Sequence, residues 1–217
     1  DHYLEVPFDL SDVFFITMFR TPVKLYAYLP FPGYREHKSL RTARELGVTI
    51  DAKPRYTVSY GNKDRAWAMR FLREKKLARN KLICLHFTGS SPQKSLPFIE
   101  GEQIMHHLKQ EGYDLLLFHD KNSYAREHSH YSSNLALTFI SHNILQTAAL
   151  IDQCRAFIGI DSGLAHIAAA LNKKTFVIYF REIWRKNSLA LGNYVYPYTY
   201  RKQGQYLLRE LKSFFQH

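Results

Sequence analysis

The sequence predicts an α/β protein in which a doubly wound parallel sheet is covered by helices on both faces. Short, almost wholly apolar runs alternate with amphipathic segments from about residue 63 to the end of the chain. Such runs are typical of parallel strands, because helices bury both faces of a parallel sheet. The chain has 217 residues and is 46% hydrophobic, so it can bury a substantial core.

The strands and helices are expected in regular alternation. The strands are predicted where β-branched, leucine and aromatic residues run together, at residues 81–87, 114–118, 135–140 (the weakest), 156–160 and 175–179. The helices are predicted where apolar residues recur at helical spacing, at residues 64–77, 100–110, 145–154, 164–171 and 203–215. Gly112 is the expected stop of the second helix.

The first 62 residues differ in character from the rest. They are aromatic and rich in turn-forming proline and glycine, with one helix expected over residues 36–46 and Gly47 as its C-cap. We therefore divide the chain into a separate amino-terminal part, residues 1–62, and an α/β domain, residues 63–217.

Charge and cysteine content narrow the function classes. Lys and Arg total 30 against 19 for Asp and Glu, a formal charge of +11, which favours a phosphorylated small molecule, a nucleic acid or an acidic membrane face as partner. No apolar run approaches the roughly 20 residues of a membrane span, and no signal peptide is expected. Cys84 and Cys154 form no CxxC, so we expect small buried side chains and a reducing, cytoplasmic location.

The segment 161–166 (DSGLAH) follows a predicted strand and opens a predicted helix. Asp161 would reach the sheet edge, and Gly163 would let a ligand approach the helix start, where N–H groups and a partial positive charge attract anions. His166 lies one turn further on. The alternative is structural: Asp161 or Ser162 caps the helix, Gly163 packs closely, and His166 is a core histidine.

The segment 86–94 (HFTGSSPQK) follows the first strand in the same way. Thr88, Ser90 and Ser91 supply hydroxyls, Gly89 supplies flexible backbone, and Lys94 supplies a positive charge. In such sheets ligands bind outside the carboxyl ends of the strands, where both segments are expected. The alternative is an ordinary polar loop with a solvated lysine.

Familiar phosphate and hydrolase motifs are absent. A Walker A loop ending at Lys94 would need glycine at positions 88 and 93, and no GxGxxG occurs. A nucleophile elbow centred on Ser162 would need glycine where Ile160 and Leu164 stand. No Asp-x-Asp occurs either, so we expect no metal site.

Together the two segments resemble the carboxyl-terminal half of glycosyltransferase family 9, the heptosyltransferase family. That family has a Gly/Ser/Thr loop with a lysine, followed downstream by D-[ST]-G-L-x-H-x-A-A-A-L and a strand. Residues 161–171 of this chain are DSGLAHIAAAL. The resemblance extends from about residue 36 to the end and is strongest over residues 81–179.

The resemblance implies a GT-B-like fold with a Rossmann-like donor-binding domain at residues 63–217. Residues 1–62 would be the remnant of the acceptor-side domain and a linker. The implied activity is inverting, metal-independent transfer of a sugar, typically heptose from ADP-heptose, to lipopolysaccharide or another surface glycan, without a cofactor.

The resemblance also assigns roles to residues of the two segments. Thr88, Gly89 and Ser90 would hold the diphosphate, Lys94 would neutralise it, and Asp161 would hydrogen-bond the sugar. The helix start at Ser162, Gly163 and Leu164 would face the phosphates, with His166 in support. Lys94 and Asp161 are the catalytic candidates. Fixed donors and a cation aimed at the negative charge that grows on the departing diphosphate are expected to be the largest catalytic term. The general base is not assigned.

Two alternatives remain beside this enzyme. One is a non-catalytic relative that keeps the fold, and the other is a basic nucleic-acid-binding module, although no nucleic-acid partner is expected because no such motif occurs. The segment 194–201 (YVYPYTYR) is expected to pack on the domain. Its alternative role is peripheral contact with the inner membrane, where tyrosine favours the interface.

Overall fold

A computed structural model describes residues 46–47, 57–119, 134–181, 190, 192–200 and 204–216 of the chain. All of them belong to the unit Glu36–His217. The helix expected over residues 36–46 lies outside the described residues except at its end, where Gly47 has a left-handed φ of 68°. The boundary at residue 62 stays a prediction.

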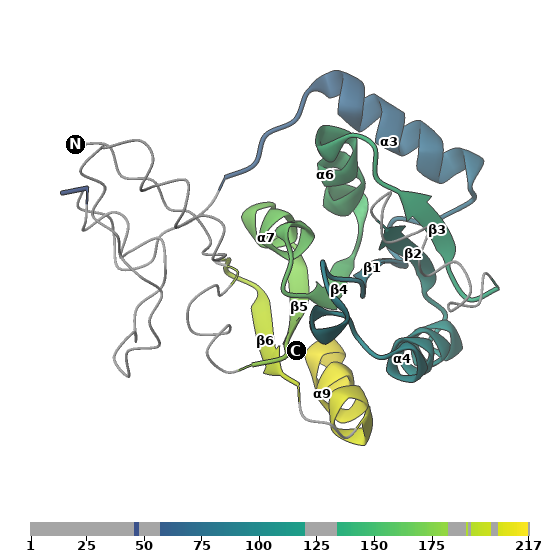
Figure 1. Ribbon diagram of the computed structural model, residues 1–217. Coiled ribbons are helices and arrows are strands. Elements are labelled where there is room, and N and C mark those ends of the chain that lie inside the picture. The colour runs from purple at the N-terminus through teal and green to yellow at the C-terminus, as the bar shows by residue number, and fades with distance from the viewer. Residues whose placement is uncertain are drawn as a thin grey trace. The chain divides into compact units, whose positions relative to one another are not determined.

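The described residues contain a six-stranded sheet in the order β3-β2-β1-β4-β5-β6 (Figure 1). Every neighbouring pair is parallel. The sheet therefore grows outward from β1 in one direction through β2 and in the other through β4, which confirms the doubly wound fold. The strands are β1 (Leu82–His86), β2 (Asp114–His119), β3 (Leu137–Ile140), β4 (Ala156–Ile160), β5 (Lys174–Tyr179) and β6 (Val195–Thr199).

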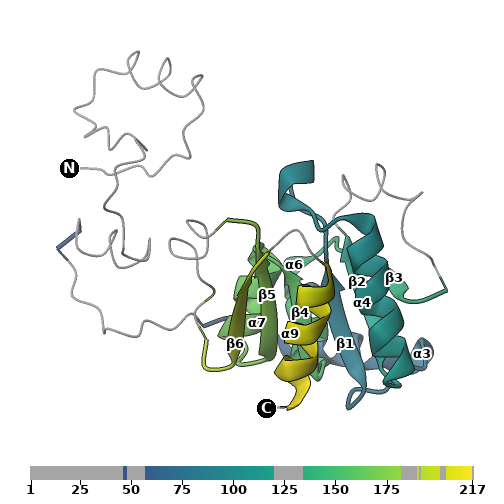
Figure 2. The same ribbon diagram turned by 90° about the horizontal axis from the view of Figure 1, so that it is seen from below.

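Helices cover both faces of this sheet, as predicted. Buried residues of α4 and α9 share one apolar cluster, and those of α3, α6 and α7 share the other; Figure 2 shows α4 and α9 together on one face. The predicted helices are present with ends shifted by a few residues: α3 (Asn62–Glu74), α4 (Phe98–Gln110), α6 (Ile144–Gln153), α7 (Gly163–Ala170) and α9 (Gly204–Gln216).

Strand β1 shows how the sequence produces the two layers. Its side chains alternate, so Leu82 and Cys84 enter the α3/α6/α7 cluster while Ile83 and Leu85 enter the α4/α9 cluster. Cys84 and Cys154 are almost fully buried, which confirms their predicted role as small core residues. Burial and a hydrogen bond with the Cys154 thiol hold the pKa of Cys84 well above its ordinary value, so this thiol stays protonated.

Strand β6 was not predicted, because Pro197 interrupts its pattern. Proline has no N–H to donate and is tolerated on an edge strand, which is where β6 lies. Tyr196 and Tyr198 stack on Phe176 with ring centroids 5.3 and 5.7 Å away. Packing on the domain is therefore confirmed for these two tyrosines, whereas Tyr194 is 61% exposed.

Three tyrosine hydroxyls tie neighbouring elements together by donating to carboxylates. The pairs are Tyr60 with Asp152 of α6, Tyr196 of β6 with Glu210 of α9 (2.5 Å), and Tyr200 after β6 with Glu100 of α4 (2.7 Å). Burial and the hydrogen bond to Glu100 raise the pKa of Tyr200 far above its ordinary value. The pKa values of Tyr60 and Tyr196 are raised as well.

These shifts predict a loss of stability at alkaline pH. Tyrosines of the unfolded chain ionise near pH 10 while those of the folded chain keep their protons, so the free energy of unfolding falls as the pH rises above about 10. Tyr200→Phe should lower stability at neutral pH by about 1–3 kcal/mol, because Glu100 loses its donor, and should make the alkaline decline shallower. Urea denaturation from neutral to alkaline pH measures both effects.

Tyr194→Phe is the matched control, because Tyr194 is largely exposed. It should change neither the stability at neutral pH nor the slope. An unchanged slope in Tyr200→Phe would contradict the assignment.

Candidate functional site

The two segments singled out in the sequence leave the carboxyl ends of adjacent strands. Strand β1 leads into residues 87–97, and β4 leads into residues 161–162. These strands pair directly, with His86 opposite Gly159. After β1 the next strand, β2, lies on one side of this pair, and after β4 the next strand, β5, lies on the other side. The point where the winding reverses is where doubly wound sheets bind ligands.

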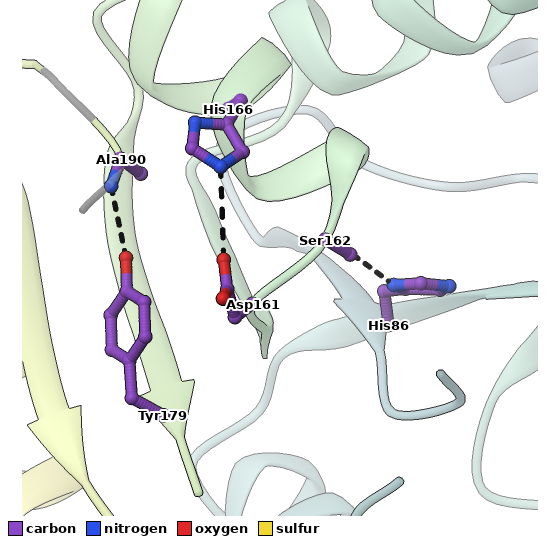
Figure 3. Close-up of polar contacts among 6 residues, drawn as sticks. All are labelled: His86, Asp161, Ser162, His166, Tyr179 and Ala190. Carbon is purple, nitrogen blue, oxygen red and sulfur yellow. Dashed lines mark hydrogen bonds and ion pairs between the residues drawn. The ribbon is translucent and has the colours of Figure 1, made fainter. Parts of the chain in front are cut away.

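A polar contact joins the two segments at this point. His86 Nδ1 and Ser162 Oγ lie 3.0 Å apart, within hydrogen-bonding distance (Figure 3). His86 is the last residue of β1 and is 7% exposed. The sequence analysis did not select it, although a polar ring ending an otherwise apolar strand, directly before a Thr-Gly-Ser loop, is a signal that could have identified it.

Ser162 does not cap α7, contrary to the capping expectation. It occupies the N-cap position with extended backbone, φ −156° and ψ 165°, but its side chain forms no cap hydrogen bond. The hydroxyl contacts His86 instead. The first N–H groups of a helix have no partner four residues back, and the Ser162 side chain occupies none of them in α7. The Ala165 amide donates to the Ser162 carbonyl at 3.1 Å.

Asp161 and His166 lie together on the α7 side of the site. His166 Nε2 is 3.7 Å from Asp161 Oδ1, an ion pair when the imidazole is protonated (Figure 3). The side chain of His166 is 31% exposed and that of Asp161 is 21% exposed, so His166 is not a core histidine. The Asp161 amide donates to the Ile178 carbonyl at 3.1 Å, which fixes the turn to β5. The pair holds an oriented carboxylate at the sheet edge.

Gly163 leaves open space at the helix start. It is exposed, and a Cβ added to it would meet no atom within 4 Å. The next residue, Leu164, is half-buried and packs on the α3/α6/α7 cluster. The chain therefore does not need glycine at position 163 for its own packing.

The segment after β1 is held by its own hydrogen bonds. The Gly89 amide donates to Ser95 Oγ at 3.0 Å, and that hydroxyl donates to the Ser91 carbonyl at 3.0 Å. The Leu96 amide donates to the Phe87 carbonyl at 2.8 Å, which closes the segment against β1. The sequence analysis missed Ser95, because one serine among several carries no pattern.

Gly89 has a different role from the flexibility that the sequence analysis gave it. A Cβ there would lie 2.6 Å from the Lys94 carbonyl oxygen and 2.7 Å from Lys94 Cβ, so the fold itself requires glycine. Thr88 is 3% exposed, whereas Ser90 and Lys94 are exposed. Lys94 ends the short 3-10 helix η1 (Pro92–Lys94). The backbone of Lys94 packs against Gly89, which fixes its position at the site.

A known protein family matches the part of the sequence that contains both segments. The model of glycosyltransferase family 9 (heptosyltransferase) matches residues 40–182, which include both segments. The chain belongs to this family. No curated protein sequence matches it.

Family 9 structures also share its fold. A family 9 glycosyltransferase from Veillonella parvula superposes with a TM-score of 0.61 at 15% identity, covering 82% of this chain and 52% of its own. The ADP-heptose lipopolysaccharide heptosyltransferase II of E. coli gives 0.59 at 18% identity (73% and 53%). E. coli heptosyltransferase WaaC with ADP gives 0.57 at 13% identity (84% and 58%).

The similarity to these structures establishes the fold class of the chain and the share of the relatives' length that it covers. The family 9 chain described here is GT-B-like and spans about half the length of these relatives. Among the described residues, none of the helices has the length and apolar character of a membrane span. The same residues contain no group of three His, Cys, Asp or Glu side chains that could hold a metal ion.

The two site glycines should respond differently to alanine. Gly89→Ala should lower the free energy of unfolding by about 1–3 kcal/mol, because its methyl group overlaps the Lys94 backbone. Gly163→Ala is the matched control and should leave stability unchanged or slightly higher, because the position is open and alanine favours helix. Urea denaturation compares them, and equal losses would contradict the packing assigned to the two segments.

Proposed function

We propose that this family 9 chain forms the donor-binding part of a glycosyltransferase that moves a sugar from a nucleoside-diphosphate donor to a surface glycan. The observation that carries the proposal is the contact between His86 and Ser162, which joins the β1 and β4 segments at the winding reversal. The donor would be an ADP-heptose or a related nucleotide sugar. Its acceptor would be lipopolysaccharide or another surface glycan, with transfer in the cytoplasm.

The donor class is supported by the relatives. WaaC of E. coli was solved with ADP and also with ADP-2-deoxy-2-fluoro heptose. The E. coli heptosyltransferase II is described as an ADP-heptose enzyme. A diphosphate carries two or more negative charges, which suits the cationic groups at the carboxyl edge of this sheet.

The diphosphate would lie against the start of α7. Gly163 leaves room for it, and the unpaired N–H groups of a helix start favour an anion. Lys94 would add a positive charge from the other segment. An exposed ion pair contributes less than about 1 kcal/mol, so Lys94 becomes important when the bound donor excludes water from it.

Asp161 would accept hydrogen bonds from sugar hydroxyls. Its partner His166 holds the carboxylate at 3.7 Å and adds positive charge when protonated. During transfer the sugar becomes oxocarbenium-like while negative charge grows on the departing diphosphate. Preorganised N–H groups and a lysine aimed at that charge stabilise the transition state, and we propose that no metal ion or cofactor is needed.

Donor binding gives the direct test. ADP should raise the melting temperature of the 217-residue chain, and Lys94→Ala should weaken ADP binding by about tenfold, or ~1.4 kcal/mol. The exposed Lys109 of α4 gives the matched control, and Lys109→Ala should bind ADP normally. No melting shift with any nucleoside diphosphate would contradict the proposed function.

Metal independence has its own test. The ADP-induced melting shift should persist in EDTA and change little when Mg²⁺ is added, because protein groups neutralise the diphosphate. The shift in EDTA is measured for wild type and for Lys94→Ala side by side. A shift that requires a divalent ion in the wild type would show that the metal, rather than Lys94, holds the donor.

A further inference from the structure

A second cationic region lies on α3 and the turn after it, apart from the donor site. Between residues 63 and 81 the chain has eight basic and two acidic residues, a net charge of +6 within a chain of +11. All eight basic residues are exposed. We call them the α3 basic surface: Lys63, Arg65, Arg70, Arg73, Lys75, Lys76, Arg79 and Lys81.

The nearby carboxylates do not neutralise this surface. Asp64 Oδ2 accepts the Gly61 amide at 3.1 Å as part of the helix cap. Glu74 pairs with Arg70 at 4.0 Å, but both side chains are more than 60% exposed. On adjoining elements, Asp152 accepts from Tyr60, and Asp114 accepts the Ala78 amide at 2.9 Å. The surplus positive charge therefore faces solvent.

The inner face of α3 is firmly packed, so the basic face is held outward. Trp67 stacks on Phe71 at 5.4 Å, and both rings contact Phe139 of β3. Ala68 and Leu72 are buried against the domain. In Figure 1, α3 lies on the outer side of α6 within the described part of the chain.

The outer face combines charge with an apolar side chain. Met69 is 40% exposed, with Arg65 and Arg73 one helical turn to either side. Clusters of four to eight Lys and Arg residues on a helix are attracted to the phosphates of anionic lipids, and Met69 adds one apolar side chain to this surface. Single-stranded nucleic acids, in contrast, are bound on exposed aromatic rings, and the aromatic residues of α3 face inward.

We propose that the α3 basic surface docks the protein onto an anionic membrane surface. The proposal rests on the proposed function, because a glycolipid acceptor is presented at a membrane. Each Lys or Arg close to an anionic leaflet strengthens binding by about fivefold, and the attraction falls within a Debye length. Docking through α3 would hold the donor site close to membrane-anchored acceptors.

Co-sedimentation with vesicles tests the docking. The 217-residue chain should bind vesicles of phosphatidylcholine with phosphatidylglycerol, lose that binding as salt rises, and not bind pure phosphatidylcholine. The triple variant Arg65→Glu, Arg70→Glu, Arg73→Glu should bind at least about tenfold more weakly.

The matched control carries the same charge change on the other face of the sheet. Lys109→Glu, Arg209→Glu and Lys212→Glu alter three exposed cations of α4 and α9, and this variant should keep most of the binding. Both variants should show wild-type melting and a normal ADP-induced shift. Equal losses in the two variants would overturn the α3 assignment in favour of net charge alone.

Two further outcomes are decisive. Tighter binding to a generic oligonucleotide than to anionic vesicles at the same salt would overturn the membrane proposal in favour of a nucleic-acid surface. Absence of vesicle binding with an intact ADP shift would overturn the docking and leave the proposed function standing. Vesicle binding without an ADP shift would support docking and contradict the donor site.

Discussion

The candidate site depends on one constraint, the parallel pairing of β1 and β4 at the centre of the sheet. Because the two strands run side by side in the same direction, the segments that follow them must emerge at the same edge. The His86–Ser162 contact is the local result, at 3.0 Å. Each segment then needs only its own short-range bonds to take shape, Ser95 in one and the Asp161–His166 pair in the other.

Much of the fold follows from the sequence because its buried strands and amphipathic helices have clear periodicity. Strand β6 was missed because its pattern combines alternating tyrosines with a proline, and its pairing with β5 depends on tertiary packing against Phe176. Edge position, which decides whether proline is tolerated, is a property of the assembled sheet and cannot be seen locally.

The sequence indicated which residue types follow the two strands, but it did not indicate which side chains contact one another. Sequence patterns pointed to Ser162 and Gly89, but the partners that explain them, His86 and Lys94, lie on another segment or across a tight turn. Ser162 contacts a histidine 76 residues away instead of its own helix. A local motif therefore names the residues, while the sheet topology decides what each one touches.

The two borders of the sheet also bear on how the protein meets other chains. At one border β3 has four residues, and at the other Pro197 breaks the row of N–H donors along β6. Short or proline-bearing borders resist the addition of a foreign strand, which protects against fibre-like self-association. Any partner chain would then have to join through side chains and loops instead of by extending the sheet.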